Sequence, residues 1–297
     1  MDVSRPGTAT RPADDEHVEI DLGRLAGVSD RGLVHTHNED AMALGCRPAA
    51  DLRPGLVAEL ALVACDGVST VRQPELASRA AADTALRVLL GPEPEVDPRR
   101  ARLPRGHRGI RAAAVAAAES VAELGRVGEL DPPSCTLVCA HLEEPADDGE
   151  PVITVGWVGD SRAYWLAAPG AEEPTRLLTT DHSWATAMIE SGRLDAATAL
   201  ADRRAHAITR WLGRAGEPEP EVVSWAPGGP GALLLCTDGL WNYLPDAADL
   251  AAVVVPALER GESPLVVAKG LTDLALRAGG HDNITVLLVP VPGAQSR

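Results

Sequence analysis

The sequence predicts one domain of a mixed α and β class, and three observations support this prediction. The chain has 297 residues, of which 45% are hydrophobic, so it is long enough to bury one large core. Helical patterns such as Pro74–Leu90 alternate with short β-rich runs such as Leu60–Cys65. No segment resembles a long linker between two domains.

The elements expected in the first half follow from local patterns. The apolar run Leu60–Cys65 predicts a buried strand that ends at Asp66. The segment Pro74–Leu90 predicts a helix, because proline suits the first helical turn. The alanine-rich stretch Arg108–Leu124 predicts a second helix.

The second half continues with strands and then turns helical. Cys135–Leu142 and Val152–Val158 predict strands of one sheet, and the Gly-Asp-Ser turn that follows predicts a hairpin over Val152–Leu166. The polar helical pattern of His182–Leu212, broken at Gly192, predicts a mobile flap over a site. The other predicted elements are the strand Ala232–Cys236, the helices Asp246–Val254 and Ser263–Ala278, and the strand Asn283–Val289.

Charge and composition exclude several classes of protein. The net charge of −16 argues against a nucleic-acid partner, because non-specific affinity for nucleic acid comes from Lys and Arg. The acidity either steers basic protein substrates or serves solubility. Five cysteines without a CxxC pair predict core residues of a reduced protein. Because no signal-peptide core or long apolar stretch occurs, we expect a cytoplasmic protein without membrane contact.

Four short acidic motifs contain the candidate metal-binding residues of this sequence. They are Asn38-Glu39-Asp40, Asp66-Gly67, Asp238-Gly239 and Asp282-Asn283. A single Asp-Gly is a common turn signal, but here an apolar strand followed by Asp-Gly occurs twice, and Asp282 leads into a further strand. We therefore expect three carboxylates at one rim, where each close pair repels by about 4 kcal/mol at an effective dielectric of about 20. Such oxygen ligands predict Mg²⁺ or Mn²⁺ and a two-metal hydrolase.

Nine motifs follow one another along the chain: Ser29–Gly32, Asn38–Asp40, Asp66–Gly67, Cys135–Val138, Gly159–Tyr164, Leu178–Ser183, Ile208–Gly213, Cys236–Leu240 and Asp282–Val286. In this order they resemble the motifs of the metal-dependent protein phosphatases, the type 2C serine/threonine class. The resemblance extends from about residue 27 to residue 289.

This resemblance implies an α+β fold in which a central β-sandwich of two antiparallel sheets is flanked by helices on both sides, in four αββα layers. The metals are expected in a cleft at one end of the sandwich. The catalytic domain is expected over residues 22–291, with structure beginning near Leu22. A disordered tail is expected over residues 1–21, and a C-terminal tail over residues 292–297.

The resemblance also implies the metal ligands and their roles. Asp66 bridges two Mn²⁺ or Mg²⁺ ions, Asp238 and Asp282 complete the first ion's protein ligands, and the Gly67 carbonyl serves the second ion. A water between the ions then attacks phosphorus in line, without a serine or cysteine nucleophile. The full implied metal set is Glu39, Asp40, Asp66, Gly67, Asp160, Asp238 and Asp282.

Within this set, Glu39 and Asp40 are expected to contact the second ion or its waters. Two interpretations of Asp160 stay open: it helps to hold a third, loosely bound ion, or it is only a turn aspartate. Catalytic roles are expected for His35, Asp40 and Asp66.

The main departure from the family pattern is His35, because family members typically carry an arginine there that grips the substrate phosphate. Histidine offers one donor when neutral and a charge only when protonated, whereas arginine offers a two-pronged donor. We therefore expect weaker phosphate binding, unless the guanidinium of Arg31, Arg72 or Arg210 binds the substrate phosphate instead.

The implied activity is removal of phosphate from serine or threonine of partner proteins, the substrates of a serine/threonine kinase, by a monomeric enzyme of bacterial type. Two alternatives remain at this point. One is a phosphoprotein-binding pseudoenzyme, suggested by His35 and by the altered stretch after Asp66. The other is an unrelated acidic ion-binding structural domain, which has no EF-hand spacing to support it.

Overall fold

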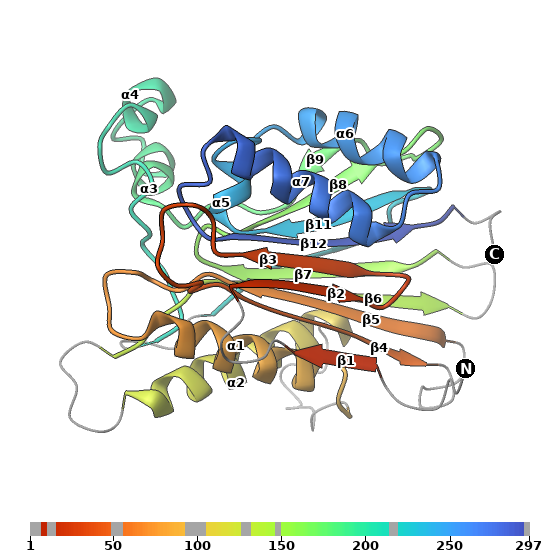
Figure 1. The fold of residues 1–297 in the computed structure, drawn as a ribbon, viewed down its shortest axis with the longest axis horizontal. Helices are drawn as coiled ribbons and strands as arrows, with labels where there is room; N and C mark the ends of the chain where they lie inside the picture. The colour runs from red at the N-terminus through yellow and green to blue at the C-terminus, as the bar shows by residue number, and fades with distance from the viewer. Residues whose placement is uncertain are drawn as a thin grey trace.

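A computed structural model describes residues 7–10, 16–48, 56–92, 105–125, 132–145, 150–213 and 219–293. In these residues, two six-stranded antiparallel sheets pack face to face, and helices cover both outer faces (Figure 1). This arrangement confirms the predicted α+β fold with its four αββα layers.

Strands of both sheets pair antiparallel with their neighbours. The first sheet contains, in spatial order, β1 (Gly7–Thr10), β4 (Ala41–Pro48), β5 (Leu56–Cys65), β6 (Leu137–Pro145), β7 (Val152–Val158) and β10 (Glu221–Trp225). The second sheet contains, in spatial order, β2 (His17–Asp21), β3 (Ala26–Asp30), β12 (Ile284–Val291), β11 (Gly231–Cys236), β8 (Arg162–Ala167) and β9 (Arg176–Leu177).

The helices form the two outer layers and one end of the molecule. Helices α1 (Pro74–Leu89) and α2 (Arg105–Leu124) cover the first sheet, while α6 (Ala247–Glu259) and α7 (Pro264–Ala278) cover the second. Helices α3 (Trp184–Glu190), α4 (Ala196–Leu200) and α5 (Asp238–Trp241) lie at one end of the sandwich (Figure 1). None of the helices in the described part of the chain has both the length and the apolar character needed to cross a membrane.

The central strands bury both faces, which explains why their sequences are continuous apolar runs. In β5, Leu60 and Leu62 enter the core between the sheets, whereas Ala61 and Val63 face α1 and α2. Because side chains alternate along a strand, one run of six apolar residues serves two separate cores.

One charged residue interrupts the apolar character of β5. Glu59 is completely buried, and Arg47 from β4 and Arg105 from the start of α2 both pair with its carboxylate. Arg47 also donates to the carbonyl oxygens of Leu90 at 3.2 Å and Gly91 at 2.8 Å, just after α1. This buried cluster therefore joins the sheet to the ends of the two helices that cover it.

The structure corrects two expectations. Strands β7 and β8 lie in different sheets, so Val152–Leu166 is not a hairpin, and the Gly-Asp-Ser turn instead carries the chain from one sheet to the other. The N-terminal segment up to Asp21 is not wholly a tail, because β2 pairs with β3 over residues 17–21, and β1 pairs with β4. Residues 1–6 and 11–15 lie outside the described residues, as do 294–297 of the C-terminal tail.

The polar pattern from His182 to Leu212 is helical only in part. Helix α3 ends at Glu190 and α4 begins at Ala196, and Gly192 between them has a φ of 65°. The predicted break at Gly192 is therefore confirmed.

Candidate metal centre

The predicted acidic residues come together where strands of both sheets begin or end. Asp66 directly follows β5, and Asp238 follows β11 as the first residue of α5. Asp40 directly precedes β4, and Asp282 stands two residues before β12. Asp160 lies in the turn between β7 and β8. Segments far apart in the sequence thus deliver five carboxylates to one end of the sandwich.

The carboxylates influence one another strongly. Burial and the charges of Asp282 and Asp238 raise the pKa of Asp40 to about 8. Burial and repulsion likewise raise the pKa of Asp160 to about 7 and the pKa of Asp238 to about 7. The pKa of Asp66 lies well above its ordinary range because of burial and the charges of the other four aspartates. A nearby cation would relieve this repulsion and keep the carboxylates ionised at neutral pH.

The chemistry of these donors fits hard divalent cations. The five side chains offer only oxygen, and Mg²⁺ and Mn²⁺ prefer oxygen ligands. Within the described residues, no group of three or more His, Cys, Asp or Glu side chains is arranged so that it could hold a metal ion by itself. Water would therefore complete the coordination, which is the usual way that proteins bind Mg²⁺.

Asp40 is held in the cluster by Thr237, the residue before Asp238. The hydroxyl of Thr237 donates to Oδ2 of Asp40 at 2.8 Å, and its oxygen accepts the backbone N–H of Thr285 at 3.0 Å. These bonds join the start of β4 in one sheet to the ends of β11 and β12 in the other.

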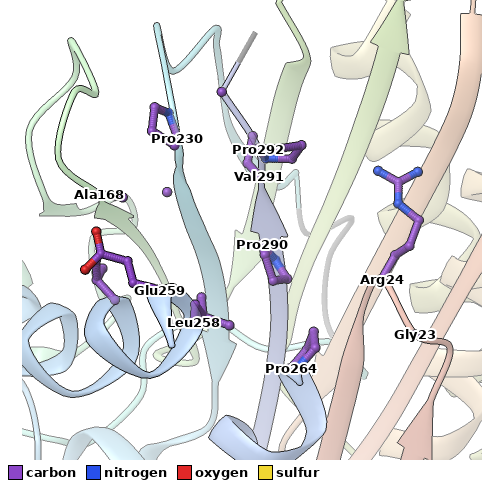
Figure 2. Close-up of a pocket in the computed structure, with 13 residues that line it drawn as sticks. Gly23, Arg24, Ala168, Pro230, Leu258, Glu259, Pro264, Pro290, Val291 and Pro292 are labelled. Carbon is purple, nitrogen blue, oxygen red and sulfur yellow. The ribbon is translucent and has the colours of Figure 1, made fainter. Parts of the chain in front are cut away.

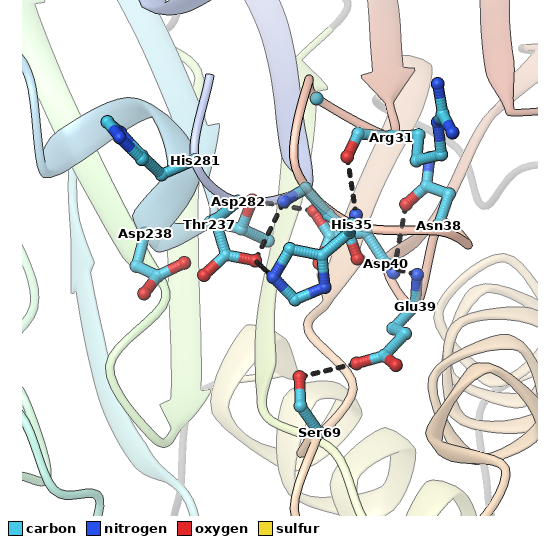
Figure 3. A network of polar contacts seen from close by, with 12 residues as sticks. Arg31, His35, Asn38, Glu39, Asp40, Ser69, Thr237, Asp238, His281 and Asp282 are labelled. Carbon is cyan, nitrogen blue, oxygen red and sulfur yellow. Dashed lines mark hydrogen bonds and ion pairs between the residues drawn. The ribbon is translucent and has the colours of Figure 1, made fainter. Parts of the chain in front are cut away.

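The Glu39 carboxylate is not brought to the aspartate cluster. Its Oε2 accepts a hydrogen bond from the Ser69 hydroxyl at 2.5 Å, and Figure 3 shows the side chain turned toward Ser69. The backbone of Glu39 is nevertheless close to Gly67, because a Cβ on Gly67 would lie 2.7 Å from the Glu39 carbonyl oxygen. Only glycine lets the two backbone segments come this close. The Gly67 carbonyl and Glu39, both expected metal ligands, are therefore neighbours.

His35 lies beside Asp282 of the cluster. Its Nε2 is 3.3 Å from Oδ1 of Asp282, and Figure 3 shows the ring between Asp282 and the backbone that carries Asp40. The side chain therefore already has an acidic partner within the cluster.

Asn283 supports the loop that carries these residues, a role that the sequence motif did not reveal. Its Oδ1 accepts the backbone N–H of Glu39 at 2.7 Å, and its Nδ2 donates to the carbonyl oxygens of Arg31 at 2.8 Å and His37 at 3.0 Å. One amide side chain thus fixes the loop between β3 and β4 beside Asp282. The Asp-Asn pair was visible in the sequence, but its backbone partners lie some 250 residues away.

Comparison with known proteins identifies the family. A sequence model described as Protein phosphatase 2C matches residues 105–284. The chain belongs to the protein phosphatase 2C family. It is 30% identical over 268 residues to the serine/threonine protein phosphatase PstP of Mycobacterium tuberculosis, covering 90% of this chain and 45% of that protein. The chain thus spans about half the length of this relative.

Other members of the phosphatase 2C family match along most of their length. The serine/threonine phosphatase stp of Listeria innocua is 27% identical over 267 residues, which cover 88% of this chain and 93% of that protein. The crystal structure of the PstP catalytic domain with two manganese ions aligns with a TM-score of 0.62 and 27% identity, covering 90% of this chain and 98% of that one.

In this phosphatase 2C chain, His182 supports the turn that carries Asp160. Its Nδ1 accepts the backbone N–H of Gly159 at 2.9 Å, and its Nε2 lies 2.9 Å from Oε1 of Glu221 and 2.8 Å from Nη1 of Arg210. The side chain is buried, and burial lowers its pKa. This environment indicates a structural role for His182.

The cysteines nearest the aspartates are packing residues. Cys65 and Cys236 are completely buried, and burial raises the pKa of both thiols well above the ordinary range. A neutral buried thiol is a poor nucleophile, because the thiolate is the reactive form.

A separate cavity of about 540 Å³ lies at the opposite end of the sandwich (Figure 2). Its lining includes Pro230 before β11 and Val291 at the end of β12, whereas the aspartates lie where β11 ends and β12 begins. The cavity is therefore no part of the metal centre.

Proposed function

We propose that this family member is a metal-dependent serine/threonine phosphoprotein phosphatase that uses two Mn²⁺ or Mg²⁺ ions. The observation that carries the proposal is the cluster of five aspartates, in which burial and the charges of neighbouring aspartates raise the pKa values of Asp40, Asp66, Asp160 and Asp238. Such a group is costly without cations, and its all-oxygen chemistry suits those two metals. When bound, the ions would lower the pKa of a water and offset charge that develops on the phosphoryl oxygens.

In this proposal some residues bind the ions and others orient the ligands. Asp66, Asp238 and Asp282 hold the ions, and the carbonyl of Gly67 adds a neutral oxygen. Thr237 keeps the Asp40 carboxylate turned into the cluster through its 2.8 Å hydrogen bond. Asp40 is thereby placed to accept hydrogen bonds from water near the ions.

Glu39 needs a change of rotamer to contribute a carboxylate, because its Oε2 is bonded to Ser69. Asp160 is proposed to bind a third ion together with Asp238, since the charge of Asp238 is the first electrostatic influence on its pKa after burial. Asn242 donates to Oδ2 of Asp238 at 3.3 Å, which fixes the orientation of that carboxylate.

The attack on phosphorus is proposed to come from water, without a phosphoenzyme. Burial of Cys65 and Cys236 keeps both thiols protonated, which supports the absence of a cysteine nucleophile. We further propose that the substrates are proteins phosphorylated by a serine/threonine kinase, and that the enzyme acts as a cytoplasmic monomer.

The proposal is tested by hydrolysis of a small aryl phosphate with Mn²⁺, with and without a chelator. We expect turnover that depends on the metal and that Asp238→Asn reduces by at least about 100-fold, roughly 2.7 kcal/mol of lost transition-state stabilisation. Asp246→Asn is the matched control, because Asp246 is an exposed carboxylate whose Oδ1 caps α6 and asparagine preserves the cap.

Two results would contradict the proposal. Turnover that persists in chelator would exclude a metal-dependent reaction, and equal losses in both variants would indicate a general effect on folding. Absent turnover with retained binding of a phosphopeptide would instead favour the phosphoprotein-binding pseudoenzyme.

A further inference from the structure

We propose that Arg72 binds the phosphate group of the substrate, in place of the arginine that resembling phosphatases carry at the position of His35. This inference rests on the proposed phosphatase function. It concerns the loop between β5 and α1, residues 66–73, which begins with the predicted metal ligands Asp66 and Gly67.

A phosphate approaching this end of the molecule meets mainly negative side chains. Five aspartates form the cluster, and His35 is within 3.3 Å of Asp282. A phosphate dianion needs positive donors besides the ions, and a planar guanidinium is the side chain best suited to phosphate oxygens.

Two of the three arginines that the sequence offers for this role are already engaged. Nε of Arg31 is 3.2 Å from Oε2 of Glu16, on the edge of the second sheet. Nη1 of Arg210 lies 3.4 Å from Oε1 of Glu221, and its Nη2 donates to the carbonyl oxygen of Glu219. Recruiting either side chain would mean breaking these contacts.

Arg72 differs from both. Its side chain is exposed, and among the described residues it has no hydrogen-bond or ion-pair partner. A guanidinium without a partner loses no protein contact when it binds an anion, so the net gain from a charge-assisted hydrogen bond is largest there.

The loop that carries Arg72 is held by contacts with other residues on both sides of Arg72. Before it, the Ser69 hydroxyl donates to the Glu39 carboxylate at 2.5 Å. After it, Pro74 lies against Gly67, since a Cβ on Gly67 would be 2.9 Å from Cβ of Pro74. Arg72 thus stands between a hydrogen bond to the side chain of Glu39 and a packing contact with Gly67, two residues of the predicted ligand set.

The local backbone also restricts where Arg72 can lie. The N–H of Val71 bonds to the carbonyl of Val68 at 3.1 Å, and the N–H of Val68 bonds to the carbonyl of Ser134 at 2.9 Å. Gln73 has a φ of 53°, the one left-handed residue other than glycine in the described chain. Such a conformation is uncommon and persists where the surroundings hold it, so the loop is ordered on both sides of Arg72.

Three other arginines at this end of the molecule are exposed without a described side-chain partner. Arg193 and Arg203 lie in the segment of α3 and α4, and Arg277 lies in the last turn of α7. No described contact ties any of them to Glu39 or Gly67. They are the alternative candidates for the experiment, since an exposed arginine elsewhere at this end of the molecule could also contact a substrate.

The experiment compares Arg72→Gln, Arg203→Gln and Arg260→Gln with the wild type, all loaded with Mn²⁺. Arg260 is the matched control, because it is exposed and directly follows α6, next to the Glu259 that lines the distant cavity of Figure 2. For Arg72→Gln we expect the KM for a phosphothreonine peptide and the inhibition constant of inorganic phosphate to rise about tenfold or more, the factor that about 1.4 kcal/mol represents. The kcat should change less than the KM.

A second measurement separates substrate contact from a structural role. Isothermal titration calorimetry with inorganic phosphate should show the same loss of affinity in Arg72→Gln, without any turnover. Adding His35→Arg to Arg72→Gln should restore phosphate affinity, because it returns a guanidinium to the centre, whereas a purely structural defect would persist.

The outcomes distinguish this inference from the proposed function. An active wild type with unchanged KM and phosphate affinity in Arg72→Gln would overturn the role of Arg72 and leave the phosphatase function intact. A loss confined to Arg203→Gln would overturn the role of Arg72 and assign the role to the segment of α3 and α4. If the wild type shows no turnover, calorimetry still decides, and equal phosphate affinity in wild type and Arg72→Gln, including none in either, overturns the inference.

Discussion

Removal of one carboxylate from the metal centre should make the metal-free protein more stable. In the folded chain, burial and the charge of Asp282 raise the pKa of Asp238 from 3.8 to about 7. A pKa raised by folding means that the unfolded chain loses this proton first. The protonated Asp238 carboxyl therefore makes its full contribution to the free energy of unfolding below about pH 3.8. This contribution is lost as the pH rises through about 7.

The size of the effect follows from the same shift. A difference of about three pKa units corresponds to a cost of about 4 kcal/mol at pH 8, as an upper value for Asp238. The shifts of the other aspartates are not added, because one protonated carboxyl relieves the repulsion on its neighbours. For Asp238→Asn in chelator we expect a gain of about 1–4 kcal/mol in the free energy of unfolding at pH 8, and a smaller gain at pH 5.

The assay is urea unfolding of wild type and Asp238→Asn at pH 5 and pH 8, each with chelator and with Mn²⁺. Added Mn²⁺ should stabilise the wild type, more at pH 8 than at pH 5, and should stabilise the variant much less. Asp246→Asn should respond as the wild type does. The reasoning fails if Asp238→Asn is less stable than the wild type in chelator at pH 8, or if its effect is the same at both pH values.

Three further predictions concern other residues. His35→Arg should lower the KM for a phosphopeptide about tenfold, because a two-pronged donor replaces a histidine beside Asp282, and an unchanged KM would count against a phosphate contact at this position. Glu59→Gln should cost about 3–5 kcal/mol in urea unfolding, because Arg47 would lose its buried partner, and a loss below about 1 kcal/mol would refute that view. Gly239→Ala should lower the melting temperature and the Mn²⁺ affinity measured by calorimetry, because the added Cβ would lie 2.0 Å from the carbonyl oxygen of Asn283. An unaltered affinity would show that the backbone accommodates the methyl group.

The sequence predicted the central strands well because their signal is local. A buried strand needs a continuous apolar run, and Leu60–Cys65 and Ala232–Cys236 supply one directly before Asp66 and before the Thr237-Asp238 pair. The predicted aspartates therefore came together as expected. The edge strand β2 was missed because only Val18 and Ile20 of its five residues are buried, so that its composition resembles a polar tail.

Other features depend on partners that local patterns do not contain. The turn around Asp160 was recognised, but nothing in those residues indicates that the strands on its two sides join different sheets. The direction of the Glu39 side chain depends on Ser69, thirty residues away. A single glutamate inside an apolar run, such as Glu59, likewise gives no hint that two arginines will meet it.

The position of the aspartates across both sheets has a consequence for kinetics. Asp66 follows a strand of the first sheet, whereas Asp238 follows a strand of the second. An ion held by both would cross-link the two layers at one edge and oppose any sliding of one layer over the other. Opening the sandwich would then require loss of the ion, so its departure could govern how long the native state survives, whatever the equilibrium stability.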